Sequence, residues 1–178
     1  MLPHPVLLAD IGGTYSRFSV LPVPRGRPGA IWKVSTTAFP GPVDAIRSYL
    51  ARHDADLPRS ALLAVAGRVD GGTTRLTNAP WRFDLGEIGA ASGLEAVRLV
   101  NDYVPLAAVL TVLGADNPDD MVQIGPSVEG TGPRLVLGPG TGLGAAVLMP
   151  AGEHLLIQTT EAGHVGFGPC ERDAGLPW

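Results

Sequence analysis

The chain has 178 residues, of which 45% are hydrophobic and 17% are charged, and this predicts a globular protein with room for one ordinary domain, or for one domain and part of another. The net charge of −4 argues against the broad basic surface with which proteins bind nucleic acid. No stretch approaches the roughly 20 apolar residues of a membrane span, and the start MLPHPVLLAD does not resemble a secretion leader, so we expect a cytoplasmic protein without a membrane partner.

The first fifty residues are predicted to form three strands and a helix. Val6 to Asp10 and Arg17 to Leu21 are β-forming runs joined by a tight turn at Ile11-Gly-Gly-Thr14. Ile31 to Thr37 is predicted as a third strand. Apolar residues at helical spacing predict a helix over Pro42 to His53, with proline in its first turn.

The middle of the chain alternates apolar runs with helical patterns. Ala61 to Ala66 is a continuous apolar run, which predicts a strand buried on both faces, and Val97 to Val100 is predicted as another buried strand. Leu85 to Ala91 is predicted as a short helix that ends at Gly93, and Val104 to Leu113 as a second helix.

Asn101 and Asp102 follow the second of these strands, at the end where open α/β sheets bind ligands. An amide can orient a ligand hydroxyl, and a neighbouring carboxylate can accept its proton. In phosphoryl transfer a carboxylate suffices, because positioning and charge stabilisation dominate. The same two residue types are also favoured as helix N-caps, so both interpretations remain open.

The last third of the chain repeats the opening pattern. After the polar break Asn117-Pro-Asp-Asp, a strand at Leu135 to Leu137 leads into Gly138-Pro-Gly-Thr-Gly-Leu-Gly144 and then a strand at Ala145 to Met149. Leu155 to Thr159 is predicted as a third strand. The chain therefore begins a second copy of its first half, and by this analogy a helix and more strands should follow.

The two glycine-rich turns are candidate phosphate-binding loops. Glycine lets backbone N–H groups approach anionic oxygens without obstruction by a Cβ, and a threonine hydroxyl adds a donor. Asp10, beside the first turn, can hold Mg²⁺ through water, because that ion prefers hard oxygen ligands and keeps several waters. Each turn taken alone could also be a plain hairpin turn.

Two other nucleotide-binding motifs fit less well. Neither turn contains G-K-[ST], which excludes a P-loop. The spacing Gly140-x-Gly142-x-x-Ala145, with Glu161 further on, matches a loose dinucleotide-binding pattern. That fold requires a helix after the glycines, whereas the sequence there favours a short strand before Pro150.

Two further segments carry candidate ligand residues. Glu161-Ala-Gly-His164 follows a strand, so its carboxylate and imidazole can face a polyhydroxylated ligand, although a solvated loop is an alternative. One Glu and one His make a poor metal site, since no further ligands cluster nearby. Leu76 to Trp81 is predicted as a packed turn, with Asn78 as a possible ligand.

Six motifs follow one another over residues 5 to 169: DIGGT, AVAG, LTNAPWRF, LVNDY, GPGTGLG and EAGHVGF. In this order they resemble the bacterial ATP-dependent glucokinases, in the sugar kinase and actin-like ATPase superfamily. The resemblance implies an α/β, RNase H-like fold, with a near-complete first domain over residues 1–113 and the start of a second over 114–178. It also implies transfer of the ATP γ-phosphate to the 6-hydroxyl of glucose with Mg²⁺, the first step of glycolysis, by a homodimer.

The resemblance assigns roles to particular residues. It makes Asp102 the general base for the sugar 6-hydroxyl, with Asn101, Glu161 and His164 at glucose-binding positions. The positions that match its two phosphate loops are Asp10, Gly12, Gly13 and Thr14 in the first, and Gly138, Gly140, Thr141, Gly142 and Gly144 in the second.

The chain departs from the family pattern in three respects, at two positions and in its length. Tyr15 replaces the usual Asn after GGT, and Ala162 replaces the first glycine of E-G-G-H. Cys170 is the only cysteine, which excludes the cysteine-rich zinc loop of related sugar kinases. The chain also stops inside the second domain, so we expect little activity from these 178 residues alone. A non-catalytic sugar-binding remnant is the alternative, and glucose is not distinguished from mannose or an amino sugar.

Overall fold

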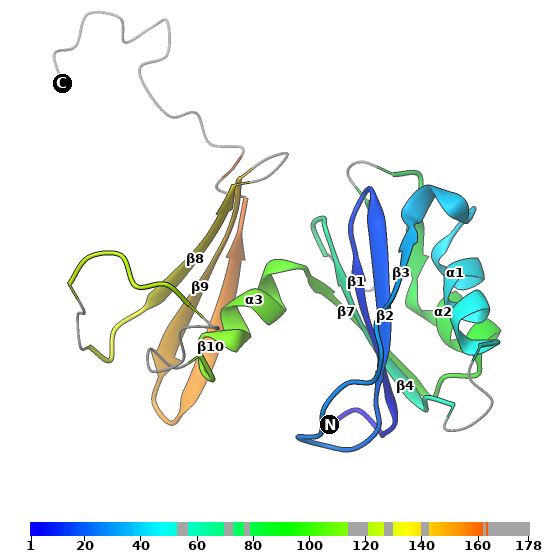
Figure 1. Cartoon of the computed structure of the whole chain (residues 1–178), viewed down its shortest axis with the longest axis horizontal. Helices are drawn as coiled ribbons and strands as arrows, with labels where there is room; N and C mark the ends of the chain where they lie inside the picture. Colours follow the sequence, from blue (N-terminus) through cyan, green and yellow to red (C-terminus); the bar gives the residue numbers. More distant parts are fainter. Residues whose placement is uncertain are drawn as a thin grey trace, which may run out of the picture. The chain divides into compact units, whose positions relative to one another are not determined.

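The computed structural model describes residues 1–52, 57–69, 73–76, 79–113, 121–126, 130–139, 143–161 and 163 (Figure 1). The chain forms two compact units, Met1–Asp102 and Tyr103–Trp178. The sequence pattern predicts a boundary near residue 113, whereas the division lies before α3, the helix Tyr103–Val109. This helix belongs to the second unit because it packs on the strands that follow it.

A five-stranded mixed sheet forms the centre of the first unit. Its order is β3-β2-β1-β4-β7, in which β1, β2 and β3 pair antiparallel and β1, β4 and β7 pair parallel. The strands are β1 (Val6–Ile11), β2 (Tyr15–Leu21), β3 (Trp32–Ser35), β4 (Ser60–Val65) and β7 (Ala96–Asn101). The hairpin and the buried strand predicted from the sequence are thereby confirmed.

Two α-helices lie on the same side of this sheet, α1 (Pro42–Leu50) and α2 (Leu85–Ser92) (Figure 1). The sequence signals at their ends act as expected. Pro42 occupies the first turn of α1, where its missing N–H costs nothing. The Asp84 carboxylate caps α2, and Gly93 ends it in the left-handed conformation with φ 68°. None of the helices in the described ranges is long and apolar enough to cross a membrane.

The hydrophobic core lies between the sheet and these helices. The Phe18 ring centroid is 5.7 Å from those of both Trp32 and Tyr49, so aromatic side chains join β2, β3 and α1. Burial also raises the pKa of Tyr49. The fully buried aliphatic residues that complete this core are Leu7, Ile11, Ile46, Leu63, Val65 and Ile88.

A two-stranded ribbon, β5 (Thr73–Arg75) and β6 (Arg82–Asp84), was not predicted from the sequence. Its strands have three residues each, too few to show an alternating pattern. The turn between them is packed as expected: Leu76 N–H donates to Trp81 O at 3.1 Å, and Trp81 Nε1 donates to Phe39 O at 3.0 Å. Residues 77–78, which include Asn78, lie outside the described residues.

The second unit contains α3 and a three-stranded antiparallel sheet in the order β10-β9-β8. Its strands are β8 (Arg134–Pro139), β9 (Leu143–Ala151) and β10 (His154–Thr160). This is the arrangement of β1, β2 and β3 in the first unit, which confirms the repeated strand-turn-strand pattern. Tyr103 Oη donates to Gly138 O at 2.9 Å and Arg134 Nη1 to Leu110 O at 2.7 Å, so α3 is tied to β8.

Several predicted elements differ from those observed, among them the first helix, which ends at Leu50 and not at His53. The strand predicted over Ile31 to Thr37 ends at Ser35, because residues 36–38 form a 3-10 turn, η1 (Thr36–Ala38). α3 ends at Val109, before a turn. The run from Val97 to Val100 was predicted to be buried on both faces, and this is wrong. β7 is an edge strand in the part of the chain that the structure describes, and its side chains are half-buried or exposed.

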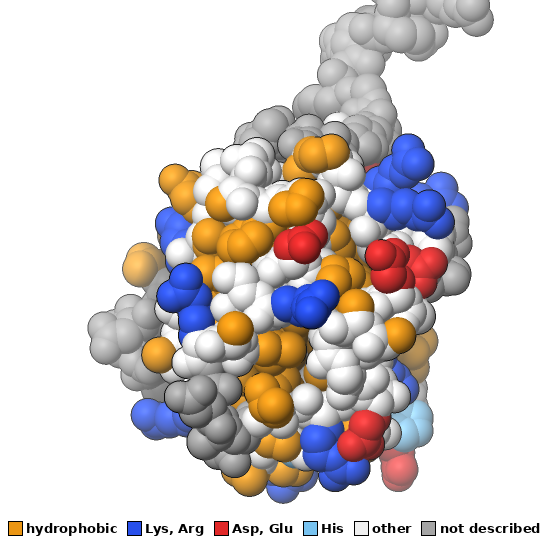
Figure 2. All heavy atoms as spheres, turned by 90° about the vertical axis from the view of Figure 1, so that its right-hand side faces the viewer, with side chains coloured by type: hydrophobic (Ala, Val, Ile, Leu, Met, Phe, Trp, Pro, Cys, Tyr) orange, Lys and Arg blue, Asp and Glu red, His pale blue; other side chains and the backbone are white. Residues whose placement is uncertain are grey.

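The helical face of the first unit carries charged groups of both signs among hydrophobic side chains (Figure 2). Elsewhere, an exposed ion pair joins the start of β4 to the loop before β7. Arg59 Nε and Nη2 donate to the two carboxylate oxygens of Glu95 at 2.6 and 2.9 Å. These hydrogen bonds lower the pKa of Glu95. The pair therefore stabilises the fold above the unfolded-state pKa of Glu95, and this contribution disappears as pH falls through the lower folded-state pKa.

We expect Glu95→Gln to lower the melting temperature slightly at pH 7, because it removes the charge that Arg59 binds. The difference from the unchanged chain should shrink as pH falls below the unfolded-state pKa of Glu95 and vanish only below its lower folded-state pKa, where the carboxyl group is protonated in the folded chain as well. Thermal denaturation at pH 7 and at a pH below both pKa values measures this. Glu153→Gln, in the exposed turn between β9 and β10, is the matched control. Equal effects of Glu95→Gln at both pH values would contradict a contribution from the ion pair.

Candidate active site

The carboxyl ends of β1, β4 and β7 meet at one edge of the first unit. Ile11 pairs with Val65, and Val65 pairs with Asn101. Backbone bonds continue this alignment past the strands, from Ala66 N–H to Ile11 O at 3.1 Å and from Asp102 N–H to Val65 O at 3.0 Å. Strands in a sheet are about 4.8 Å apart, so the first glycine turn and Asp102 are separated by two strand spacings, roughly 10 Å.

Asn101 and Asp102 thus lie where the sequence pattern predicts them, at the carboxyl end of a parallel strand. Both are half-buried. Asn101 Nδ2 donates to Gly67 O at 3.1 Å, so the amide also holds the segment that follows β4. Asp102 directly precedes Tyr103, the first residue of α3, so helix capping and proton acceptance both remain compatible with its position.

The first glycine turn is closed by a bond from Gly12 N–H to Tyr15 O at 3.0 Å. A Cβ at Gly12 would lie 3.3 Å from Tyr15 O, a tight contact that the hairpin could accommodate only by a small shift, so the absence of a side chain at Gly12 suits the close approach of the two strands. Gly13 is half-exposed and Thr14 is exposed. The two residues that follow Gly12 are therefore accessible to a ligand.

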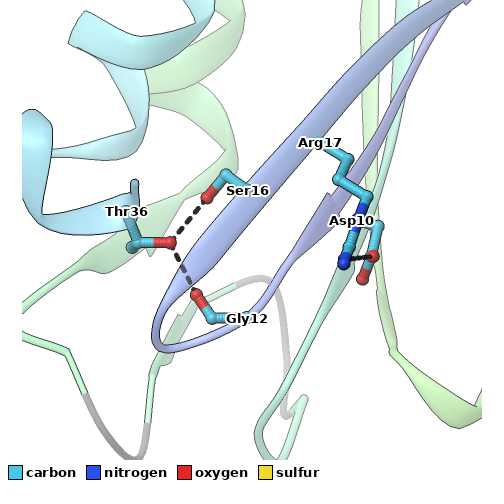
Figure 3. A network of polar contacts seen from close by, with 5 residues as sticks. All are labelled: Asp10, Gly12, Ser16, Arg17 and Thr36. Carbon is cyan, nitrogen blue, oxygen red and sulfur yellow. Dashed lines mark hydrogen bonds and ion pairs between the residues drawn. The ribbon is translucent and has the colours of Figure 1, made fainter. Parts of the chain in front are cut away.

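Asp10 forms an ion pair that the sequence patterns did not point out. Arg17 Nη1 donates to Asp10 Oδ2 at 2.7 Å, and both side chains are about half exposed (Figure 3). Asp10 and Arg17 are partners in the β1–β2 register, equally far from the centre of the turn at Gly13 and Thr14. That symmetry was a usable signal, since a two-residue turn pairs the residues equidistant from its centre.

Asp10 and Arg17 lie on one face of the sheet, and Lys33 on β3 lies on the same face, which we call the charged face. Lys33 is opposite Arg17 in the β2–β3 register, and its Nζ lies 4.1 Å from the centroid of the Tyr15 ring. A cation over an aromatic face is attracted by the ring quadrupole. Tyr15, which stands where the family pattern has Asn, is therefore held at the surface by Lys33.

The second glycine turn is described only at its ends. Gly140, Thr141 and Gly142 lie outside the described residues. The ring of Tyr103 occupies the space that a Cβ would need at both Gly138 and Gly144. These two glycines therefore have a packing role in the second unit, whatever else they do.

The remaining predicted ligands follow β10. Glu161 is exposed, and His164 lies outside the described residues. A Cβ at Gly163 would overlap Leu143 O, so Gly163 itself lies against the start of β9. Among the described residues no group of three or more His, Cys, Asp or Glu side chains could hold a metal ion.

The dinucleotide-binding alternative is wrong. The pattern from Gly140 to Ala145 would have to open a helix whose N-terminus holds the pyrophosphate. The strand β9 begins at Leu143 instead and runs to Ala151.

The close contact of Tyr103 with Gly144 predicts non-additive substitutions. We expect Gly144→Ala to lower the free energy of unfolding by about 1–3 kcal/mol, because the methyl group displaces the ring. Tyr103→Ala removes the obstruction, so the double variant should cost less than the sum of the single ones. Urea denaturation measures all three, with Gly132→Ala as the control, since a Cβ there meets open space. Additive costs would show that the ring and the glycine do not compete for space.

The family model for glucokinase matches residues 7–175 of the chain. The chain is 38% identical over 176 residues to a glucokinase of Paramagnetospirillum magneticum, covering 96% of this chain and 53% of that protein. It is 39% identical over 173 residues to a glucokinase of Sinorhizobium medicae, covering 96% of this chain and 50% of the relative. The chain thus spans about half the length of the curated relatives it matches.

Solved structures agree with this comparison. A glucokinase from an Antarctic psychrotroph superimposes with a TM-score of 0.77 at 28% identity, over 95% of this chain and 54% of that one. A glucokinase from Balamuthia mandrillaris in complex with glucose has a TM-score of 0.67 at 21% identity, over 92% of this chain and 49% of that one, and so supports the fold alone. Together they confirm the α/β fold expected from the sequence.

Proposed function

Because the chain belongs to the glucokinase family, we propose that the protein transfers the γ-phosphate of ATP to the 6-hydroxyl of glucose. The observation that carries this proposal is the common edge of the first unit. There the register of β1, β4 and β7 aligns a glycine turn, suited to phosphate, with Asn101 and Asp102, suited to a sugar hydroxyl. Phosphoryl transfer needs such positioning more than it needs covalent chemistry by the protein.

In this proposal Asp102 accepts the proton of the sugar 6-hydroxyl, and Asn101 orients the sugar. The charged face beside the first turn favours the phosphates. Arg17 and Lys33 both lie on it, and guanidinium and ammonium groups stabilise negative charge on phosphate oxygens. The further residues proposed to contact sugar are Asn78, Glu161 and His164, and those proposed to contact phosphate are Gly12, Gly13, Thr14, Gly138, Gly140, Thr141, Gly142 and Gly144.

Mg²⁺ fits the proposed site through Asp10. This carboxylate is half-exposed beside the glycine turn, and Mg²⁺ is usually held by one or two carboxylates together with water and substrate phosphates. Asp10 would hold the ion through water, and Arg17 fixes the orientation of the carboxylate. When bound, the ion neutralises charge on the transferred phosphate.

The cellular setting is also a proposal. We propose a cytoplasmic homodimer that acts in glycolysis, on the resemblance to bacterial glucokinases and on the absence of long apolar segments from the sequence. Light scattering of the purified protein measures the mass of the assembly.

The role of Asp102 gives a direct test by substitution. We expect the 178-residue chain to release ADP in a glucose-dependent reaction, at a rate well below the ~10 s⁻¹ that is typical of enzymes. Asp102→Asn should lower this rate by about 10²–10⁴-fold, because it removes the proton acceptor. Asp44→Asn, in the exposed first turn of α1, is the matched control and should leave the rate unchanged.

Calorimetry with glucose, with and without ATP, separates the possible failures. Glucose binding without ADP release would contradict the kinase proposal and favour a non-catalytic sugar-binding protein. Loss of both binding and turnover would contradict each of these functions. Full turnover by the Asp102→Asn variant would show that Asp102 is not the proton acceptor.

A further inference from the structure

Two hydroxyl side chains are completely buried beside the first glycine turn, Ser16 on β2 and Thr36 in η1. Burying a hydroxyl costs free energy unless it is hydrogen-bonded. Ser16 Oγ lies 2.9 Å from Thr36 Oγ1, and Thr36 Oγ1 donates to Gly12 O at 2.8 Å (Figure 3). The two side chains therefore form a continuous chain of hydrogen bonds that ends on the backbone of the turn.

The direction of this chain follows from the proton count. A hydroxyl group donates one hydrogen bond, and a carbonyl oxygen only accepts. Thr36 gives its proton to Gly12 O, so Ser16 must donate to Thr36 Oγ1. Thr36 also donates its backbone N–H to Thr14 O at 3.0 Å. Thr36 thus holds the carbonyl groups on both sides of Gly13.

The bond to Gly12 O also sets the direction of the next N–H group. In a trans peptide the C=O of one residue and the N–H of the next point in opposite directions. With Gly12 C=O directed at the buried Thr36, the N–H of Gly13 points away from the interior. Gly13 is half-exposed, and within the described residues no acceptor is recorded for its N–H. Without the bond this peptide could turn over readily, because glycine adopts both signs of φ.

We propose that Ser16 and Thr36 are positioning residues for phosphate, which hold the Gly12–Gly13 peptide so that the Gly13 N–H faces the phosphate oxygens of the substrate. The inference rests on the proposed function, since it assumes that this turn binds phosphate. Asp10 and Arg17, which lie on the opposite face of the same hairpin (Figure 3), supply charge. Ser16 and Thr36 supply the fixed orientation of a backbone donor.

The test compares three substitutions in the full 178-residue chain. Thr36→Val keeps the shape and removes the hydroxyl, Thr36→Ser keeps the hydroxyl, and Ser16→Ala removes only the first donor. Thr37→Val is the matched control, because Thr37 Oγ1 forms a similar 2.9 Å bond to Ser35 Oγ at the exposed surface. The probe is inorganic pyrophosphate with Mg²⁺, titrated while the amide N–H signal of Gly13 is followed by NMR, and melting temperatures are recorded in parallel.

We expect Thr36→Val to weaken pyrophosphate binding about tenfold, which corresponds to one net hydrogen bond, and to abolish the shift of the Gly13 amide signal. Thr36→Ser should restore both, Ser16→Ala should cause a smaller loss, and Thr37→Val should change neither.

A merely structural bond would lower the melting temperature of Thr36→Val without changing its affinity, and that result would overturn the proposal. If Thr36→Val does not fold, equal affinity and an unchanged Gly13 shift in Ser16→Ala would overturn it. Failure of the unchanged chain to bind pyrophosphate would instead contradict the proposed function.

Discussion

The parallel pairing of β1, β4 and β7 is the constraint on which the candidate site depends. This register is set by burial: Ile11 and Val65 are register partners, and both point into the core beneath α1 and α2 with no exposed surface. A slip of one residue would turn these side chains toward the opposite face of the sheet. The packing of the core therefore determines which backbone positions meet at the carboxyl edge. The relative positions of the first glycine turn and Asp102 are therefore set by buried core residues.

The β1–β2 hairpin uses its two faces for different purposes. Alternation along β2 directs Ser16 into the interior and Arg17 to the surface (Figure 3). The interior face contributes a network of buried hydroxyl groups that holds the turn. The exposed face contributes the ion pair with Asp10 and the neighbouring Lys33. A single alternation thus separates the groups that fix the backbone from the groups that carry charge.

The sequence predicted the features that depend on local signals. The hairpin around Gly12 and Gly13, and the helix ended by Gly93, follow from turn chemistry and capping. Features that depend on distant residues were not predicted. Ser16 and Thr36 are twenty residues apart, and their contact requires the β2–β3 register. The edge position of β7 depends on which strands pair, and the sequence of the strand alone does not show this. Asn78 and His164 lie outside the residues that the structure describes, so their roles as ligands remain predictions.

We propose that the carboxyl ends of β1, β4 and β7 join a phosphate-binding turn to the base that activates the sugar. A crystal structure of the chain with glucose and a non-hydrolysable ATP analogue tests it most directly. We expect an Asp102 carboxylate oxygen about 2.6–3.2 Å from the 6-hydroxyl of glucose, and analogue phosphate oxygens against the Gly13 N–H. Glucose bound at a distance from Asp102, or an Asp102 side chain engaged only in capping α3, would contradict it.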